Sequence, residues 1–181
     1  MTFSEITAAF EAYTGVMGEI EDAELAIWYN EAQLDLSLDF GHVKTAVLAP
    51  DENGIASPPP DSIKVFDADT DFGWNSAGDL VFPDRAPVTI YYRAMPAVEH
   101  VFTGTNPDQT PDLPDALHYL LAIFAAAMYW DRESEGDTEE MNLANKWLSR
   151  YNAAKHMFLS KMDRAGNSNV DHWVVFPKGE R

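Results

Sequence analysis

The 181-residue sequence contains no cysteine and few basic side chains. Without cysteine there is no disulfide framework, no thiolate metal site and no thiol nucleophile, so stability has to come from packing. The chain has 12 Lys or Arg residues against 30 Asp or Glu, which gives a net charge of −18. A body this acidic is repelled by a nucleic-acid backbone, so sequence-reading contact with DNA is not expected over most of its surface.

The charge is spread unevenly along the chain. Residues 1–145 hold 27 acidic and 5 basic side chains, a net charge of −22, whereas residues 146–181 hold 3 acidic and 7 basic side chains, a net charge of +4. Two interpretations of the acidic body stay open. It can serve solubility alone, or it can form a surface that lies near DNA without gripping it.

The sequence also lacks a membrane span and a secretory signal. A span needs about 20 apolar residues, and the most apolar run, residues 113–130, contains Asp115 and His118. The capping-box pattern of Thr2 and Glu5 begins a helix where a signal peptide would have its basic start. The protein is therefore expected to stay inside a cell, or inside a particle assembled there.

The run 113–130 predicts a buried helix, with Asp112 as its cap and Pro114 in its first turn. A helix that is apolar nearly all round is buried on several faces. We expect its own domain to cover one side and a neighbouring subunit to cover the other. The residues assigned to this subunit packing are Tyr119, Ile123, Ala127 and Trp130.

Two further amphipathic helices complete a helical core. The pattern after the turn at 131–137 predicts a long helix to residue 162, antiparallel to the preceding one, with Asp137 and Glu140 at capping-box spacing. Near the N-terminus, a helix is expected from its cap Asp22 to its stop at Gly41. Its apolar stripe consists of Leu25, Trp28, Tyr29, Ala32, Leu36 and Phe40.

Residues 50–112 have a different texture, rich in Pro and Gly around short β-prone runs at 63–66, 79–82 and 88–93. The predicted fold is mainly α: an antiparallel helical bundle over residues 1–165, with a small antiparallel β layer inserted at about 50–112. Residues 166–181 are expected to form an extended C-terminal arm. This β-prone arm either folds back onto the sheet or is offered to another chain.

Motifs for catalysis or cofactor binding are missing from the sequence, which has no Gly-rich phosphate loop, no G-x-S-x-G and no H-E-x-x-H. A single histidine such as His118 on an apolar helix is expected to be a hydrogen-bonded core residue. Asp67, Asp69 and Asp71 open like a calcium loop, but Phe72 takes the place of the required glycine. Exposed carboxylates alternating along a strand explain this pattern without an ion. We expect no enzyme, metal or cofactor.

The layout resembles the head-to-tail adaptor, or connector, proteins of tailed bacteriophages and related gene transfer particles, over residues 3–162. The shared features are an N-x-A-Q helix, a Y-x-x-x-P strand end, an L-P-x-x-x-H helix start and a Y-N step in the last helix. Here they are Asn30, Ala32 and Gln33, then Tyr92 and Pro96, then Leu113, Pro114 and His118, then Tyr151 and Asn152. The acidic stretch 67–79 and the tail 173–181 depart from the pattern.

The resemblance implies a structural protein of the virion neck, assembled in the host cytoplasm. Such a subunit forms a ring, commonly a dodecamer, that docks on the portal protein and presents a surface for a stopper or tail-completion protein. Double-stranded DNA passes through the ring without specific binding, which the acidic body favours. The portal-binding arm would use Trp173, Val174, Val175 and Phe176 as apolar anchors and Lys178 and Arg181 as charge partners.

Two other functions remain as alternatives. An acidic protein-binding module, for example an inhibitor that mimics nucleic acid, would use the same charge, would stay monomeric and would bind a basic protein in a salt-sensitive way. A hydrolase or metal enzyme would need polar residues that converge on a pocket, and the sequence indicates none.

Overall fold

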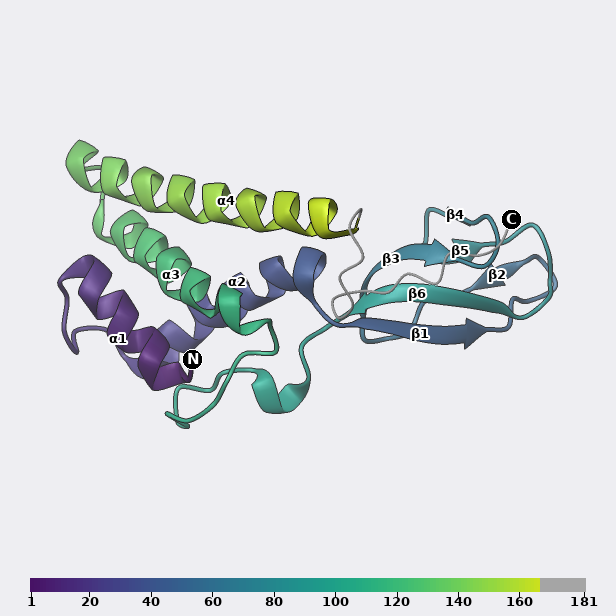
Figure 1. Cartoon of the computed structure of the whole chain (residues 1–181), viewed down its shortest axis with the longest axis horizontal. Helices are drawn as coiled ribbons and strands as arrows, with labels where there is room; N and C mark the ends of the chain where they lie inside the picture. Colours follow the sequence, from purple (N-terminus) through teal and green to yellow (C-terminus); the bar gives the residue numbers. More distant parts are fainter. Residues whose placement is uncertain (167–181) are drawn as a thin grey trace. The chain divides into compact units, whose positions relative to one another are not determined.

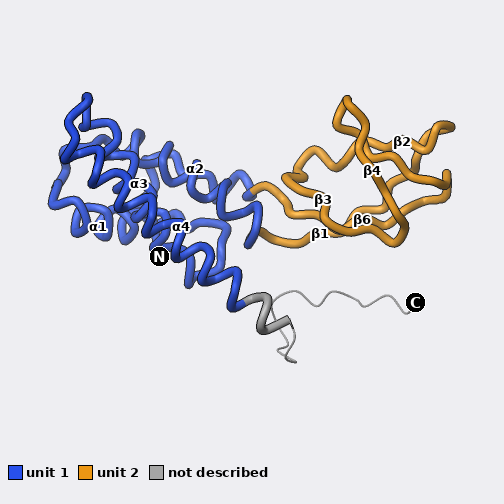
Figure 2. The backbone as a smooth tube through the Cα atoms, turned by 90° about the horizontal axis from the view of Figure 1, so that it is seen from above, with its two compact units in different colours: residues 1–40, 96–170 blue, residues 41–95, 171–181 orange. Residues whose placement is uncertain are grey.

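A computed structural model describes residues 1–166 of the chain, with side chains described as far as Lys161. The chain divides into two compact units (Figure 2). Of the described residues, the helical unit contains 1–40 and 96–166, and the β unit contains 41–95. The described part is thus a mixture of helices and two small antiparallel sheets, so the expected helical bundle accounts for only one of the two units.

The described part of the helical unit has four α-helices: α1 (Phe3–Thr14), α2 (Asp22–Phe40), α3 (His118–Glu133) and α4 (Thr138–Gly166). Two short 3-10 helices, η1 (Val98–His100) and η2 (Asp115–Leu117), lie in the connection that leads to α3. Figure 1 shows α3 and α4 as the expected antiparallel hairpin, closed by a tight turn in which Glu135 and Gly136 both have positive φ.

Helix α3 lies at the centre of the helical unit and packs against α1, α2 and α4. This explains why its sequence is apolar nearly all round, since three helices of the same chain cover it. The alanines 125–127 are fully buried and allow close approach of the surrounding helices. The predicted stripe of α2 is confirmed, because all six of its members are buried in this core.

Two helix starts differ from the sequence-based expectation. Asp112 does not cap the helix that follows it, because its carboxylate accepts from the backbone N–H of Ala97 at 3.1 Å. The chain instead enters α3 through η2, whose preceding residue is Pro114. Asp22 is the first residue inside α2, and the N–H groups of Glu24 and Leu25 bond the carbonyl of Glu21. The capping box of Thr2 and Glu5 is confirmed.

Within residues 41–95, the β unit contains two three-stranded antiparallel sheets. In the first, β6 (Val88–Ala94) lies between β1 (Val43–Leu48) and β3 (Ser62–Ala68); in the second, β5 (Leu80–Val81) lies between β2 (Ile55–Ala56) and β4 (Gly73–Trp74). Burial alternates strictly along β6, so that the side chains of Val88, Ile90, Tyr92 and Ala94 lie in the core of this unit.

The limits of the β region also differ from the expected 50–112. Strands begin at Val43, ahead of the first Pro-rich turn, and end at Ala94. Residues 96–112 have the same Pro- and Gly-rich composition, yet they belong to the helical unit. Composition marks where turns occur, but not which core the turns pack against.

Candidate functional site

The connection between β6 and α3 is long and largely irregular, and side chains of α2 hold it in place. Asn30 pairs with the backbone of Phe102 in both directions: its Nδ2 donates to the Phe102 carbonyl and its Oδ1 accepts from the Phe102 N–H, each at 2.8 Å. Backbone groups outside helices and sheets must find partners when they are buried. Asn30 therefore substitutes for a strand or helix partner at this point of the connection.

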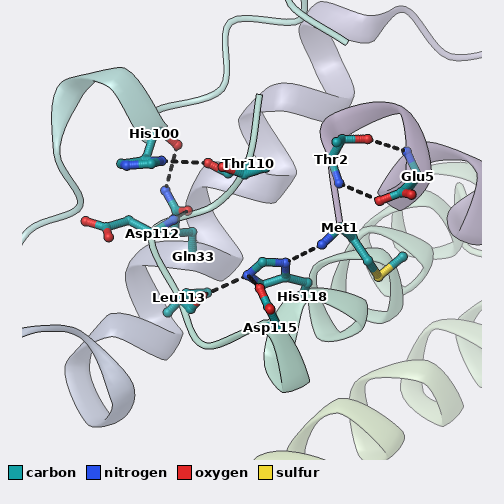
Figure 3. Close-up of polar contacts among 10 residues, drawn as sticks. All are labelled: Met1, Thr2, Glu5, Gln33, His100, Thr110, Asp112, Leu113, Asp115 and His118. Carbon is teal, nitrogen blue, oxygen red and sulfur yellow. Dashed lines mark hydrogen bonds and ion pairs between the residues drawn. The ribbon is translucent and has the colours of Figure 1, made fainter. Parts of the chain in front are cut away.

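Gln33, one turn further along α2, binds the same connection at two other places. Its Nε2 donates to the carbonyl of His100 at 3.1 Å, and its Oε1 accepts from the N–H of Asp112 at 2.8 Å (Figure 3). The side chain is only 1% exposed, so both bonds are shielded from water. Residues 97–113, as held by Asn30 and Gln33, are called the clamped connection below.

Further hydrogen bonds lie within the clamped connection. The ring Nδ1 of His100 contacts the carbonyl of Thr110 at 2.8 Å, and Gln109 donates to the carbonyls of Glu99 and Val101 at 2.8 and 2.7 Å. These bonds join the first part of the connection, residues 99–101, to its later part, residues 109–110. It is therefore a shaped surface element, although it has almost no regular secondary structure.

The clamped connection also supports the start of α1. The first N–H groups of a helix have no partner inside the helix. Here the N–H of Phe3 donates to the carbonyl of Gln109 at 2.7 Å and that of Ser4 donates to the carbonyl of Pro107 at 3.0 Å. Helices α1 and α2, from the start of the chain, thus fix a segment that follows the whole β unit in sequence.

His118 stabilises the junction between the connection and α3. Its Nε2 contacts the carbonyl of Leu113 at 2.8 Å and its Nδ1 contacts the amino group of Met1 at 2.7 Å (Figure 3). Burial lowers the pKa of His118 below its usual value, and the nearby ammonium of Met1 acts in the same direction. Leu113 and Asp115 act in the opposite direction. The residue is thus a hydrogen-bonded core histidine, as expected.

Tyr151, the tyrosine of the Y-N step, links α4 to α2. The Tyr151 hydroxyl donates to the Asp35 carboxylate at 2.6 Å, and Lys155 lies 2.9 Å from Asp35 and 3.2 Å from Asp39. Burial and the hydrogen bond to Asp35 raise the pKa of Tyr151 far above its usual range. The acidic edge of α2 is thus partly neutralised by α4 within the same chain.

The motif residues of the helical unit thus serve assembly of the fold. Asn30, Gln33, His118 and Tyr151 each bond a partner distant in the sequence, which for His118 is the amino group of Met1. Among the residues whose side chains are described, no group of three or more His, Asp or Glu could hold a metal ion. Asp67 and Asp69 accept backbone N–H groups of Ala68 and Thr89, and the Asp67, Asp69 and Asp71 side chains are exposed.

The residues predicted for subunit packing differ in accessibility. Ile123 and Ala127 are buried inside their own chain. Tyr119 and Trp130 are half-buried, beside Phe158 and Tyr129 respectively. Of these four predicted residues, only Tyr119 and Trp130 therefore keep exposed surface that a neighbouring copy could contact. The predicted portal-binding residues 173–181 lie outside the described residues.

Sequence reasoning missed one surface of the helical unit. Ile27, Leu34 and Leu38 are exposed on α2 by 57%, 46% and 38%. The signal was present in the sequence, since these residues lie outside the stripe assigned to the core and are apolar nevertheless. The exposed apolar surface is therefore a feature of α2, and the more apolar helix α3 is largely enclosed.

The fold and these contacts define a protein with a shaped connection before α3 and an exposed apolar row on α2. Residues 78–171 match the family model described as SU10 adaptor protein, which is more than half of the chain. The chain belongs to the SU10 adaptor protein family, and the resemblance to phage head-to-tail adaptors is confirmed. No curated protein matches the chain significantly.

The matched stretch contains β6, the clamped connection, α3 and all of α4. Asn30 and Gln33, which hold that connection, lie outside the match. Within residues 1–166, none of the helices combines the length and hydropathy that crossing a membrane requires.

Proposed function

We propose that the chain is the ring-forming subunit of a head-to-tail adaptor, which docks on the portal protein once DNA has been packaged. The ring presents its other side to a stopper or tail-completion protein. The observation that carries this proposal is the family match over residues 78–171, which covers both helices of the central hairpin. Partners of this kind follow from the resemblance, and so does the dodecameric ring.

The charge of the chain supports a role beside DNA. Residues 1–145 carry a net charge of −22, and a surface of this sign lowers the local concentration of phosphate groups. A channel wall of this kind lets DNA pass without retaining it. The same charge is expected of an acidic module that mimics nucleic acid, so charge alone does not separate the two functions.

Portal docking is assigned to the C-terminal arm. Its apolar anchors would be Trp173, Val174, Val175 and Phe176, with Lys178 and Arg181 as charge partners. An extended apolar segment joins a partner by strand addition, in which backbone hydrogen bonds give affinity and side-chain pockets give specificity. Tyr119 and Trp130, which keep partly exposed rings, are the remaining candidates for subunit packing on α3.

The test is the mass of the full-length protein, measured by light scattering after size exclusion, alone and mixed with its candidate portal ring. We expect a complex of ring stoichiometry that is lost on deletion of residues 167–181. Two matched double variants separate the contribution of the apolar anchors of the arm from that of its basic side chains. W173A/F176A should abolish binding, whereas K178A/R181A should mainly slow association and change its salt dependence.

Other outcomes would identify the alternatives. A monomer that ignores the portal but binds a basic protein, with affinity falling steeply as salt rises, would establish the acidic binding module. A complex that survives the deletion would leave the adaptor function intact and assign docking to another surface.

A further inference from the structure

Helix α2 carries an apolar row on the side that faces away from the core. Ile27, Glu31, Leu34 and Leu38 follow one another at spacings of four, three and four residues, which places them on one face of a helix. The three apolar members are between 38% and 57% exposed, whereas the opposite face is buried against α3. These four residues are called the α2 stripe.

The clamped connection also carries exposed apolar residues. Asn30 and Gln33 of α2 hold that connection through the carbonyls of Phe102 and His100. Val98 and Val101 of that connection are both exposed. Single exposed apolar side chains are normal, but a row of three on one face of a helix is typical of a contact surface.

Helix α4 carries a row of different chemistry. Lys146, Arg150, Ala153, Met157 and Lys161 share one face, again at spacings of four and three residues, and are called the α4 stripe. From Met141 to Lys161 the sequence contains four Lys or Arg and no acidic residue. Met157 is 45% exposed. In an acidic chain, this face is a basic surface with an apolar centre.

The aromatic core of the helical hairpin orients two cations of the α4 stripe. The guanidinium of Arg150 lies 4.7 Å from the centre of the Trp147 ring, and the ammonium of Lys161 lies 5.5 Å from that of Phe158. Lys155 points to another side of α4, where it pairs with Asp35 and Asp39 of α2. The α4 stripe therefore does not face the α2 helix of its own chain.

We propose that the α2 stripe of one copy packs against the α4 stripe of the next copy. This pairing brings Glu31 to the cations of the α4 stripe and covers the apolar residues of α2 with Met157 and the aliphatic stems of Arg150 and Lys161. Pairing of two α2 stripes would bring two Glu31 carboxylates together, and pairing of two α4 stripes would oppose cations. Charge complementarity therefore selects the heterologous contact.

A heterologous contact between two different faces repeats from copy to copy and closes into a ring when the rotation allows. The inference rests on the proposed function in this respect, because an adaptor ring needs such a contact. It goes further by assigning the two faces of this contact to α2 and α4.

The absence of cysteine allows a direct test. We would make the variant L34C/M157C, with one thiol on each stripe, and oxidise it in the assembled state. Disulfides form only where Cα atoms approach to within about 7 Å. The expected product is a ladder of dimers, trimers and larger species that collapses to one band on reduction. A mixture of L34C and M157C proteins should stop at the dimer. The control L34C/N145C moves the second thiol to another exposed side of α4.

Each outcome has a separate meaning. Dimers from L34C alone or from M157C alone would indicate an isologous contact and overturn the inference. A ring mass by light scattering without any L34C/M157C ladder would also overturn it, while leaving the adaptor function intact. Failure to assemble with or without the portal would contradict both the ring function and this interface.

Charge reversal supplies a second readout that needs no disulfide. E31K and K146E should each shift the mass from the assembled value towards that of one chain, and the double variant E31K/K146E should recover part of the loss. Loss in the single variants without recovery in the double variant would indicate that the two residues do not meet. The side chains of Glu31 and Lys146 are exposed, so these substitutions should leave the fold unchanged.

Discussion

Asn30 in α2 forms two hydrogen bonds with the backbone of Phe102, each 2.8 Å long, across 72 residues of sequence. The contact bypasses the entire β unit, which is inserted between the two partners. The helical unit is therefore closed by side chains that reach a connection formed after the insertion. This gives Asn30 a structural role that helix propensity alone would not assign to an asparagine.

The first prediction concerns the strength of this pair. Asn30→Ala removes one donor and one acceptor and leaves the Phe102 backbone groups without their side-chain partner, so the free energy of unfolding should fall by about 1–3 kcal/mol. Denaturant unfolding with an unchanged slope would measure it. The neighbouring exposed substitution Glu31→Ala should change stability by less than about 0.5 kcal/mol. Equal effects of the two substitutions would contradict the role of Asn30.

The second prediction uses the two opposite bonds of Gln33. In Gln33→Glu, an ionised carboxylate can still accept from the Asp112 N–H but cannot donate to the His100 carbonyl. Burial without a cation should raise the pKa of the new carboxyl above that of an unfolded glutamate. Stability lost at neutral pH should therefore return as pH falls through that raised pKa, because the protonated acid donates again.

The measurement for Gln33→Glu is its unfolding free energy relative to the unsubstituted protein between pH 7 and pH 5. Gln33→Leu, which has neither donor nor acceptor, is the matched control and should show a deficit that does not depend on pH. A constant deficit in both variants would indicate that the donor function of Gln33 contributes nothing.

The third prediction concerns His118, whose pKa is lowered from its ordinary 6.5, first by burial. The folded state favours the neutral ring, so the unfolded chain binds the proton first as the pH falls. The free energy of unfolding should therefore decrease from just above pH 6.5 down to the folded-state pKa and then stop responding to this group. Above pH 6.5, His118 makes its full contribution to the free energy of unfolding.

An NMR titration of the His118 ring should give a midpoint below 6.5. Comparing the pH dependence of stability with that of His118→Gln isolates this residue, because the other four histidines remain in both proteins. A midpoint at or above 6.5 would mean that the ring is stabilised as a cation.

The fourth prediction compares two glycines with similar backbone angles. Gly104 has a φ of +73°, and a Cβ there would lie 2.6 Å from the Asp22 backbone, whereas Gly15 has a φ of +77° with open space around it. Gly15→Ala should cost only the left-handed backbone strain, about 1–2 kcal/mol. Gly104→Ala should cost more, because two backbone segments must also move apart. Similar melting temperatures for the two variants would show that the contact relaxes freely.

The sequence predicted the elements that have a local signature. The apolar stripe from Leu25 to Phe40 and the β-prone run at 88–93 are confirmed as helix and strand, because both patterns are properties of neighbouring residues. Strand β1 was missed at Val43–Leu48, where the burial of successive residues does not alternate regularly. It is a strand because it pairs along its whole length with β6, from Val43 opposite Arg93 to Leu48 opposite Val88.

The contact surfaces were harder to predict. The run 113–130 is the most apolar in the chain and was expected to contact a neighbouring subunit, but Ile123 and Ala127 are buried by the helices of their own chain. The less apolar α2 keeps Ile27, Leu34 and Leu38 exposed. Hydropathy records how apolar a segment is, whereas exposure depends on how many other elements cover it.

The sequence by itself determined the helices, the main strands, the acidic charge and the family resemblance, because periodicity, composition and motif spacing are carried by neighbouring residues. Only the tertiary structure decided that Asn30 and Gln33 hold the connection before α3, that Asp112 bonds Ala97 and does not cap a helix, and that α2 has the exposed stripe. These features arise from partners distant in sequence, and their hydrogen bonds and burial exist only once the chain has folded.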